Sequence, residues 1–434
     1  MIHLLQFFHV LFFSGSLYVP VPNFPVVGNS LPVGVFFIAH VTIAEYSIGA
    51  IILAVALETW AVVKHDPRGM RYARALTNSY YLLFSLGATF AVFAVMLMIG
   101  LWGPLMGTLI NEFLPVVAVA FGLFIVLMPA LVVYRNSFGK MGPRAHLALG
   151  MLVAALQTLF LVLIVAIDSY LITPTATSYG ALASPSYLPL LLHRLVGSIS
   201  WTALLLAAVA VIRLRQAGSE EERLFQSWAA RLNLRIGVVF LMLMPVIGYI
   251  LLLTLQGSVV GYFDNLVGGS AGNAMVLQMC IFSIVLISAN VAIGWEKEPG
   301  TSSGVMLLLV IVGCTVGTLP SSVLGPSIFL LRYIGTAFAV VITMLNLIWH
   351  SLAGTEVEAA AAHPAPGAQR LIAFEGSAAA RWAVVIAGVL AAVLALYMGY
   401  LKEEARGTYA VYGVLQQSAA HGHYQPPAGI YPTS

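Results

Sequence analysis

The chain has 434 residues, of which 60% are hydrophobic and only 8% are charged. A soluble domain carries about 25% charged residues, so this sequence has too few ionic groups to cover a surface that faces water. The composition therefore excludes a soluble enzyme, a nucleic-acid-binding protein and a disordered chain. With a mean hydropathy of +0.97, most of the chain is expected to lie in a lipid bilayer.

Ten apolar runs are long enough to cross a membrane, because a spanning helix needs about 20 apolar residues. We therefore predict an all-α, polytopic transmembrane helix bundle. A further apolar stretch, residues 1–19, is predicted to be either an interfacial helix or an eleventh span. The ten predicted spans are 33–63, 77–101, 113–135, 146–172, 187–213, 232–256, 273–295, 303–320, 326–352 and 382–401.

Lysines and arginines concentrate in the odd-numbered connections between these runs, such as Lys64, Arg68, Arg71 and Arg74 in the first. Positive loops stay in the cytoplasm, so the first span enters from the outside and the chain ends outside. The stretch 219–232 is predicted to be a separate cytoplasmic helix along the interface. The predicted units are an N-terminal segment 1–32, a nine-helix bundle 33–352, a solvated cytoplasmic linker 353–381, an additional spanning helix 382–401 and an unstructured outer tail 402–434.

Two histidines lie inside spans at a similar depth from the outer surface. His40 is about seven residues into the first span, or about 10 Å, and His193 is about six residues into the fifth. Met275 and Met279 lie in the first two turns of the seventh span. Histidine and methionine are axial ligands of b-type haem. We therefore predict one or two haems b near the outer leaflet, with one methionine opposite His193, and His40 holding a second haem.

Other residues near these histidines fit the same hypothesis. Gly197, one turn after His193, is predicted to leave space for the flat macrocycle. Arg194 and Arg332 lie at outer helix ends, and a buried arginine needs an anion, so both are predicted to meet haem propionates. The alternative is that the histidines are hydrogen-bonding residues between helices, that the methionines are core residues and that Arg194 extends to the interface.

Acids within the spans are candidates for proton transfer. Glu45 and Glu58 are possible proton relays, although Glu45 and Asp168 are also explained as hydrogen-bonded or interfacial acids. Glu58 lies beside the basic first connection, so we expect it to pair with Lys64 or Arg68. Histidines at helix ends and in loops are predicted to be interfacial or solvated: His3, His9, His65, His146 and His350.

The first span reads HVTIAEYSIGAIILAVALETWAV, with His40 followed by Gly49 and by Glu58-Thr59 at the helix end. This pattern resembles the first helix of subunit I of the cytochrome bd quinol oxidases, in which a haem-ligating histidine precedes a glycine by nine residues. Three further segments are similar to that family: FSLGATFAV at 84–92, FGK at 138–140 and LLHRLVGS around His193. The resemblance implies that His40 and His193 are haem ligands.

The chain also departs from that family. The connection 256–272 is much shorter than the family's quinol-binding loop, and the second, third and eighth predicted spans contain no acid, because Glu112 is placed in the loop before the third. The predicted function is a haem b-binding membrane subunit of a respiratory electron-transfer complex that lacks the standard quinol loop and oxygen site. Two alternatives stay open, a divergent terminal oxidase subunit that reduces oxygen and a cofactor-free membrane anchor or transporter.

The predicted location is the cytoplasmic membrane of a prokaryote, with the haem side toward the outside. Expected partners are other membrane subunits of the complex, an outer-face cytochrome c or iron–sulfur subunit, and lipid or quinone. No nucleic acid is expected.

Overall fold

The computed structural model describes residues 28–175, 179–296, 300–320, 329–360 and 376–421. Within these ranges ten helices are long and apolar enough to cross a membrane, which confirms the predicted all-α bundle. The apolar stretch 1–19 lies outside the described residues. The elements are α2 Ser30–Lys64, α3 Pro67–Leu101, α4 Gly103–Asn136, α5 Pro143–Ile172, η1 Tyr179–Ala183, α6 Tyr187–Gln216, α7 Glu220–Ser258, α8 Val260–Val267, α9 Gly272–Gly294, α10 Thr301–Thr318, α12 Phe329–Ala360, α13 Ala378–Ala405, β1 Tyr409–Val411, β2 Leu415–Gln416 and α14 Gln417–Ala420.

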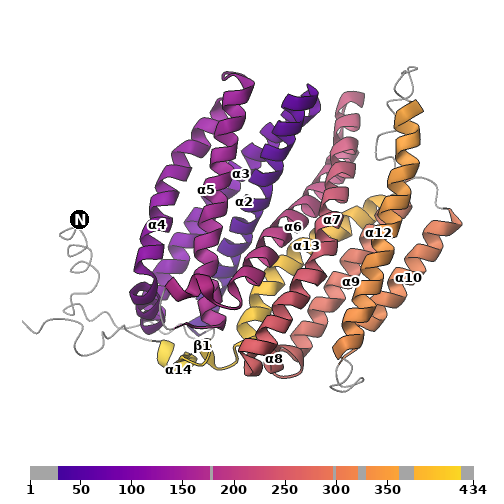
Figure 1. The fold of residues 1–434 in the computed structure, drawn as a ribbon. Coiled ribbons are helices and arrows are strands. Elements are labelled where there is room, and N and C mark those ends of the chain that lie inside the picture. The colour runs from indigo at the N-terminus through magenta and orange to yellow at the C-terminus, as the bar shows by residue number, and fades with distance from the viewer. Residues whose placement is uncertain (1–27, 176–178, 297–299, 321–328, 361–375, 422–434) are drawn as a thin grey trace, which may run out of the picture.

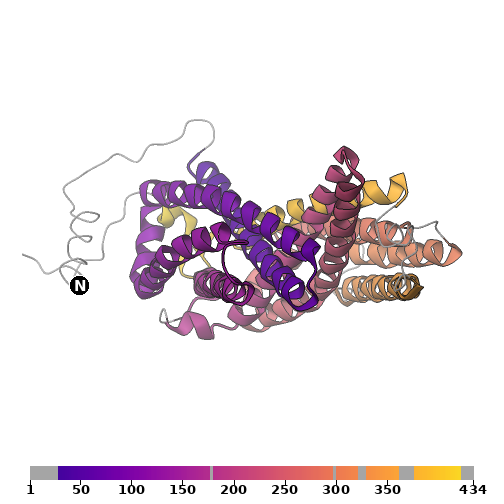
Figure 2. The same cartoon turned by 90° about the horizontal axis from the view of Figure 1, so that it is seen from above.

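The spanning helices form an elongated row (Figures 1 and 2). Helices α2 to α5 make up one end, α6, α7 and α13 the middle, and α9, α10 and α12 the other end. The last spanning helix, α13, packs between α6 and α9, so the end of the chain completes the centre of the bundle. Below, "outer end" means the end that carries α8, β1 and α14 (the lower end in Figure 1), which the charge pattern assigns to the outside.

Two helices that begin at the cytoplasmic end, α3 and α7, have side-chain caps. The Asp66 carboxylate accepts from the backbone N–H of Arg68 at 2.8 Å before α3, and hydrogen bonds from the Arg68 side chain lower the pKa of Asp66. Ser219 accepts from the N–H of Glu222 at 3.2 Å and starts α7. Such caps satisfy N–H groups that the first helical turn leaves free. The segment 219–232 is therefore not a separate helix but the first part of α7.

Glycines allow three helices to approach α6 closely. A Cβ on Gly237 of α7 would lie 2.7 Å from Leu204 Cγ, and one on Gly388 of α13 would lie 2.6 Å from Ala208 Cβ. Gly49 of α2 meets the backbone of α6 at Ser198 in the same way. Small residues at helix contacts are the usual means of close packing in membranes. Helix α6 is thus fixed between α2, α7 and α13.

The described part of the C-terminal tail folds back on the bundle, which differs from the unstructured tail that we expected. Strands β1 and β2 pair antiparallel, and the Tyr412 N–H donates to Leu171 O of α5 at 3.0 Å. The Tyr412 ring meets Tyr262 of α8, and His421 lies 4.0 Å from Trp102 between ring centroids. The tail therefore covers the outer ends of the chain's own helices.

Helix boundaries differ from the sequence prediction at two further points. Glu112 lies within α4, because α3 ends at Leu101 and α4 begins at Gly103. The third spanning helix therefore does contain an acid, contrary to our expectation. Helix α12 continues to Ala360, into the linker that was predicted to be solvated from residue 353.

A large side chain at the contact between α13 and α6 should strongly destabilise the folded protein. In Gly388→Leu the new side chain has to displace the backbone around Leu204, and overpacking typically costs about 1–3 kcal/mol. We expect a lower thermal midpoint in detergent. The matched control is Gly122→Leu on α4, where a Cβ has open space. Equal midpoints for the two variants would contradict the central position of α13.

Candidate functional site

Four buried charged side chains meet near the outer end of the bundle, each from a different helix. Arg194 of α6 donates from Nε to Glu45 Oε1 of α2 at 3.1 Å, and its Nη1 bonds Asp168 of α5. Lys402 of α13 donates to Asp168 Oδ1 at 2.9 Å. These side chains are between 12% and 20% exposed. We call Glu45, Asp168, Arg194 and Lys402 the outer charge cluster; its two acids and two bases balance.

The ion pairs of the outer charge cluster bear on the roles that we predicted for Arg194, Glu45 and Asp168. Arg194 already has two carboxylate partners from the chain itself, so the chain does not leave it free for a propionate. Glu45 and Asp168 each form an ion pair with Arg194, and the relay role of Glu45 stays a prediction. Lys402 was missed because the apolar run ends at residue 401, whereas α13 continues to Ala405.

His40 is positioned on α2 by a hydrogen bond to the neighbouring helix. Its Nδ1 lies 2.9 Å from Gly87 O of α3. A carbonyl oxygen only accepts, so Nδ1 carries the hydrogen and, in the neutral ring, Nε2 keeps its lone pair. Histidines that bind metals are commonly held in this way, with the other ring nitrogen donating to a carbonyl or carboxylate.

His193 lies on α6, directly before Arg194. Its Nδ1 is buried and has no hydrogen-bond partner among the described residues. The imidazole ring faces Gly248 of α7, and a Cβ added to that glycine would lie 3.8 Å from the ring. Gly197 does not leave open space on the next turn, because the Met244 methyl of α7 would lie 3.2 Å from a Cβ there. Met244 is a thioether that contacts α6 one turn from His193, and nothing in the sequence predicts it there.

The two methionines predicted as ligands differ in their surroundings. Helix α9 packs mainly against α13 and α10, and α6 is not among its main partners. Met275 packs against the same apolar cluster as Leu191 and Leu195, which flank His193 in sequence. Met279 is half-buried and does not pack against that cluster. Both methionines stay predictions as the ligand opposite His193.

Several buried polar atoms in this region have no partner among the described residues. They include Ser198 Oγ, Trp201 Nε1 and Thr202 Oγ1 on α6. Arg332 of α12 donates from Nε to Leu319 O at 2.6 Å, while its Nη2 is buried and unpaired. Buried polar groups are nearly always hydrogen-bonded, so the unpaired Nδ1 of His193 and the unpaired Nη2 of Arg332 fit bound polar groups, whereas Thr202 lies against Gly49 of α2. The residues present thus suit haem at the two histidines, and Arg332 is the better candidate for a propionate.

A second buried polar cluster lies at the cytoplasmic end, made of Glu58 of α2, Tyr134 of α4 and His146 of α5. Tyr134 Oη donates to Glu58 Oε2 at 2.5 Å, and His146 Nδ1 lies 2.6 Å from Glu58 Oε1. His146 Nε2 lies 3.1 Å from the Tyr134 carbonyl oxygen. We call these three residues the inner cluster.

The inner cluster corrects two expectations. Glu58 pairs with His146 and not with Lys64 or Arg68, and Arg68 instead bonds Asp66. His146 is 3% exposed rather than solvated. A weak signal was present in the sequence, since Gly150 follows His146 by one turn and gives room for the Tyr134 ring.

Comparison with known proteins places the chain among respiratory membrane proteins. The sequence model of "Cytochrome bd terminal oxidase subunit I" matches residues 31–296, which include α3 to α9 and nearly all of α2. A similar solved structure is the bd oxidase from Geobacillus thermodenitrificans, with a TM-score of 0.52 and 13% identity over 87% of this chain and 97% of that chain. That identity supports a shared fold alone. No curated protein matches the sequence.

Removing the central cation of the outer charge cluster should destabilise the protein. In Arg194→Gln, Glu45 loses its partner and Asp168 keeps only Lys402, and breaking a buried ion pair costs about 3–5 kcal/mol. The double variant Glu45→Gln/Arg194→Gln leaves the neutral Asp168–Lys402 pair, so we expect it to be more stable than the single variant. Thermal unfolding in detergent measures both. A double variant less stable than Arg194→Gln would contradict this account of the charges.

Proposed function

The chain belongs to the cytochrome bd terminal oxidase subunit I family, and we propose that it is a haem b-binding membrane subunit of a respiratory electron-transfer complex. The observation that carries the proposal is the hydrogen bond from His40 Nδ1 to Gly87 O, which directs an Nε2 lone pair away from the carbonyl. The unpaired Nδ1 of His193 on the adjacent helix supports a second ligand position. Haem b, when bound, supplies a one-electron carrier.

The chain's own residues would hold the cofactor and set its surroundings. His40 would ligate one haem through Nε2, and His193 another, with Met275 as the first candidate opposite it and Met279 or Met244 as the alternatives. Arg332 would bind a propionate through its unpaired Nη2. Because Arg194 and Lys402 neutralise Glu45 and Asp168, little net charge stands beside the histidines. Arg194 holds Glu45 in an ion pair, so we propose a structural role for Glu45 before a role as a proton relay.

Two features of the structure bear on the substrate chemistry. The connection between α7 and α9 contains only the eight-residue helix α8, which supports a subunit without a long quinol-binding loop. Glu112 within α4 supports the other candidate, a divergent terminal oxidase, because that family has a glutamate in its third helix. Carbon monoxide binding and oxygen uptake with quinol separate the two candidates.

Partners follow from the same proposal. Other membrane subunits of the complex would cover exposed apolar helix faces, with lipid or quinone on the rest. An outer-face cytochrome c or iron–sulfur subunit would meet the folded tail, since the tail covers the outer ends of α4, α5 and α8. The proposed location is the prokaryotic cytoplasmic membrane, with the haem side outward.

The purified protein should show b-type absorbance in a reduced-minus-oxidised spectrum. His40→Ala and His193→Ala should each lose a haem, because each removes an axial ligand. His350→Gln, at the cytoplasmic end of α12, is the matched control and should keep the full spectrum. Absence of b-type absorbance in the wild type, or unchanged haem content in both alanine variants, would favour a cofactor-free anchor or transporter.

Substitution of the methionines should identify the ligand opposite His193. We expect Met275→Leu to change the position and redox midpoint of one haem band, since leucine keeps the volume but has no sulfur. Met279→Leu and Met244→Leu are compared in the same assay and should leave the band in place. A change seen only in Met279→Leu or only in Met244→Leu would reassign the ligand to that residue.

A further inference from the structure

The inner cluster is built to hold a proton between Glu58 and His146. His146 Nε2 faces a carbonyl oxygen, so it carries a hydrogen, and Tyr134 Oη donates its own hydrogen to Glu58 Oε2. Between Nδ1 and Oε1, 2.6 Å apart, there must then be one more hydrogen, on either atom. Without it two lone pairs would face each other at hydrogen-bonding distance. Imidazole is the stronger base of the two, so we place this hydrogen on Nδ1, and the Glu58–His146 pair is then an imidazolium and a carboxylate that are neutral as a unit.

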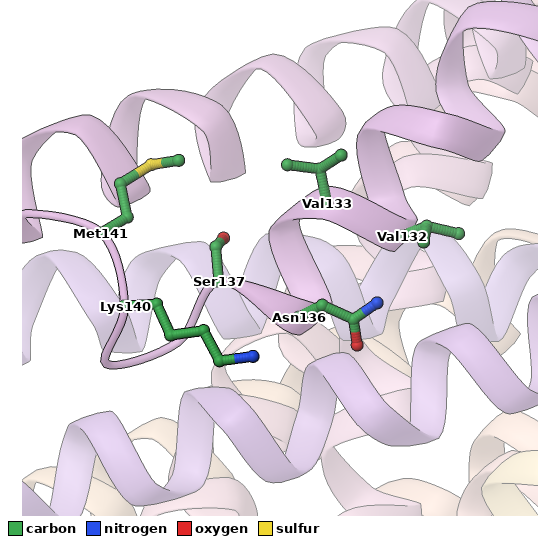
Figure 3. Close-up of a pocket in the computed structure, with 6 residues that line it drawn as sticks. All are labelled: Val132, Val133, Asn136, Ser137, Lys140 and Met141. Carbon is green, nitrogen blue, oxygen red and sulfur yellow. The ribbon is translucent and has the colours of Figure 1, made fainter.

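The two ends of this pair face different surroundings. Glu58 Oε2 is directed inward, to the Tyr134 hydroxyl of α4. His146 Nε2 is directed to the Tyr134 carbonyl oxygen, which also accepts from Ser137 Oγ at 3.2 Å. Ser137 lines an open pocket of about 400 Å³ at the cytoplasmic end of α4 (Figure 3). A pocket of this size admits water, so the histidine end of the pair is one hydrogen-bonded group away from the cytoplasmic side.

We propose that Glu58 and His146 form a proton-exchange site that is connected to the cytoplasm through the pocket at Ser137. Starting from imidazolium and carboxylate, a pocket water comes between Nε2 and the Tyr134 carbonyl oxygen and takes the Nε2 proton while it passes one of its own protons on to the pocket. The bare Nε2 then accepts a hydrogen bond from this water, so that no two lone pairs face each other. The ring becomes a neutral imidazole that still donates from Nδ1 to Glu58, and the net charge of the pair falls from zero to −1. Uptake reverses these steps, and the proton held between Nδ1 and Oε1 stays in place.

The surrounding charges suit such an exchange. Among the described residues Glu58 has no ion-pair partner besides His146, and its second carboxylate oxygen accepts from the Tyr134 hydroxyl of α4. Lys140 stands at the rim of the pocket (Figure 3), and its ammonium group would stabilise the pair in its −1 state. Any use of this proton to balance an arriving electron rests on the proposed function, whereas the exchange itself does not.

Solid-state NMR of the full-length protein in nanodiscs, labelled with ¹⁵N-histidine, tests the proposal without requiring haem. His146 is assigned by the signal that His146→Gln removes. We expect Nδ1 to remain protonated between about pH 5 and 8, while the Nε2 proton exchanges with water. In Glu58→Gln the Nδ1 proton should be lost, because the carboxamide can donate to that nitrogen. Tyr134→Phe, which keeps both members of the pair, should retain it.

Blocking the pocket tests the route to the cytoplasm. Val133→Trp should slow exchange of the Nε2 proton at least about tenfold, because exchange then requires local opening. The matched control is Val117→Trp, an exposed position on the same helix, which should exchange at the wild-type rate. An unprotonated Nδ1 in the wild type would overturn the proton-sharing pair, and equal exchange rates in the two tryptophan variants would overturn the route. Absence of haem would leave both results unaffected.

Discussion

Pairing of buried charge is the constraint on which the arrangement of this bundle depends. An ion that is buried without a partner costs several kcal/mol, so Arg194 fixes α6 against the acids on α2 and α5, and Asp168 in turn fixes Lys402 of α13. Four helices, α2, α5, α6 and α13, are thereby held around one point. His40 precedes Glu45 by just over one turn, and His193 adjoins Arg194. The positions of both candidate ligands therefore follow from the ion pairs and not from the apolar contacts alone.

Helix α13 lies beyond the part of the chain that the family model matches, yet it is central in space. It packs between α6 and α9, approaches α6 through Gly388 and supplies Lys402 to the outer charge cluster. An added helix at the edge of a bundle would need none of these contacts. The tail that follows it then covers α5 and α8, so the C-terminal part of the chain stabilises the family-like part.

The spans could be predicted from the sequence because hydropathy along the chain is a local signal, and the depth of His40 and His193 followed from counting residues. The pairing of charges could not, because Glu58 and His146 are 88 residues apart and Asp168 and Lys402 are 234 apart. The same contacts explain the errors at helix ends. An apolar run stops at the first charged residue, but α13 continues past Lys402 because Asp168 satisfies that charge inside the protein.

The predicted haem ligand His40 and the inner cluster lie near opposite ends of α2. The distance between them determines how strongly a charge at the outer end can change the proton affinity at the inner end. His40 and Glu58 are 18 residues apart on one helix, or about 27 Å. With an effective dielectric constant of about 20, unit charges at that distance interact by about 0.6 kcal/mol, a change of about threefold in proton affinity. The hydrogen-bonded pair Tyr80–Gln157 lies at intermediate depth, but no hydrogen bond among the described residues joins it to either cluster. Direct electrostatic coupling is thus weak, and tight coupling of an electron at the outer end to a proton at the inner end would require rearrangement of the polar side chains between them.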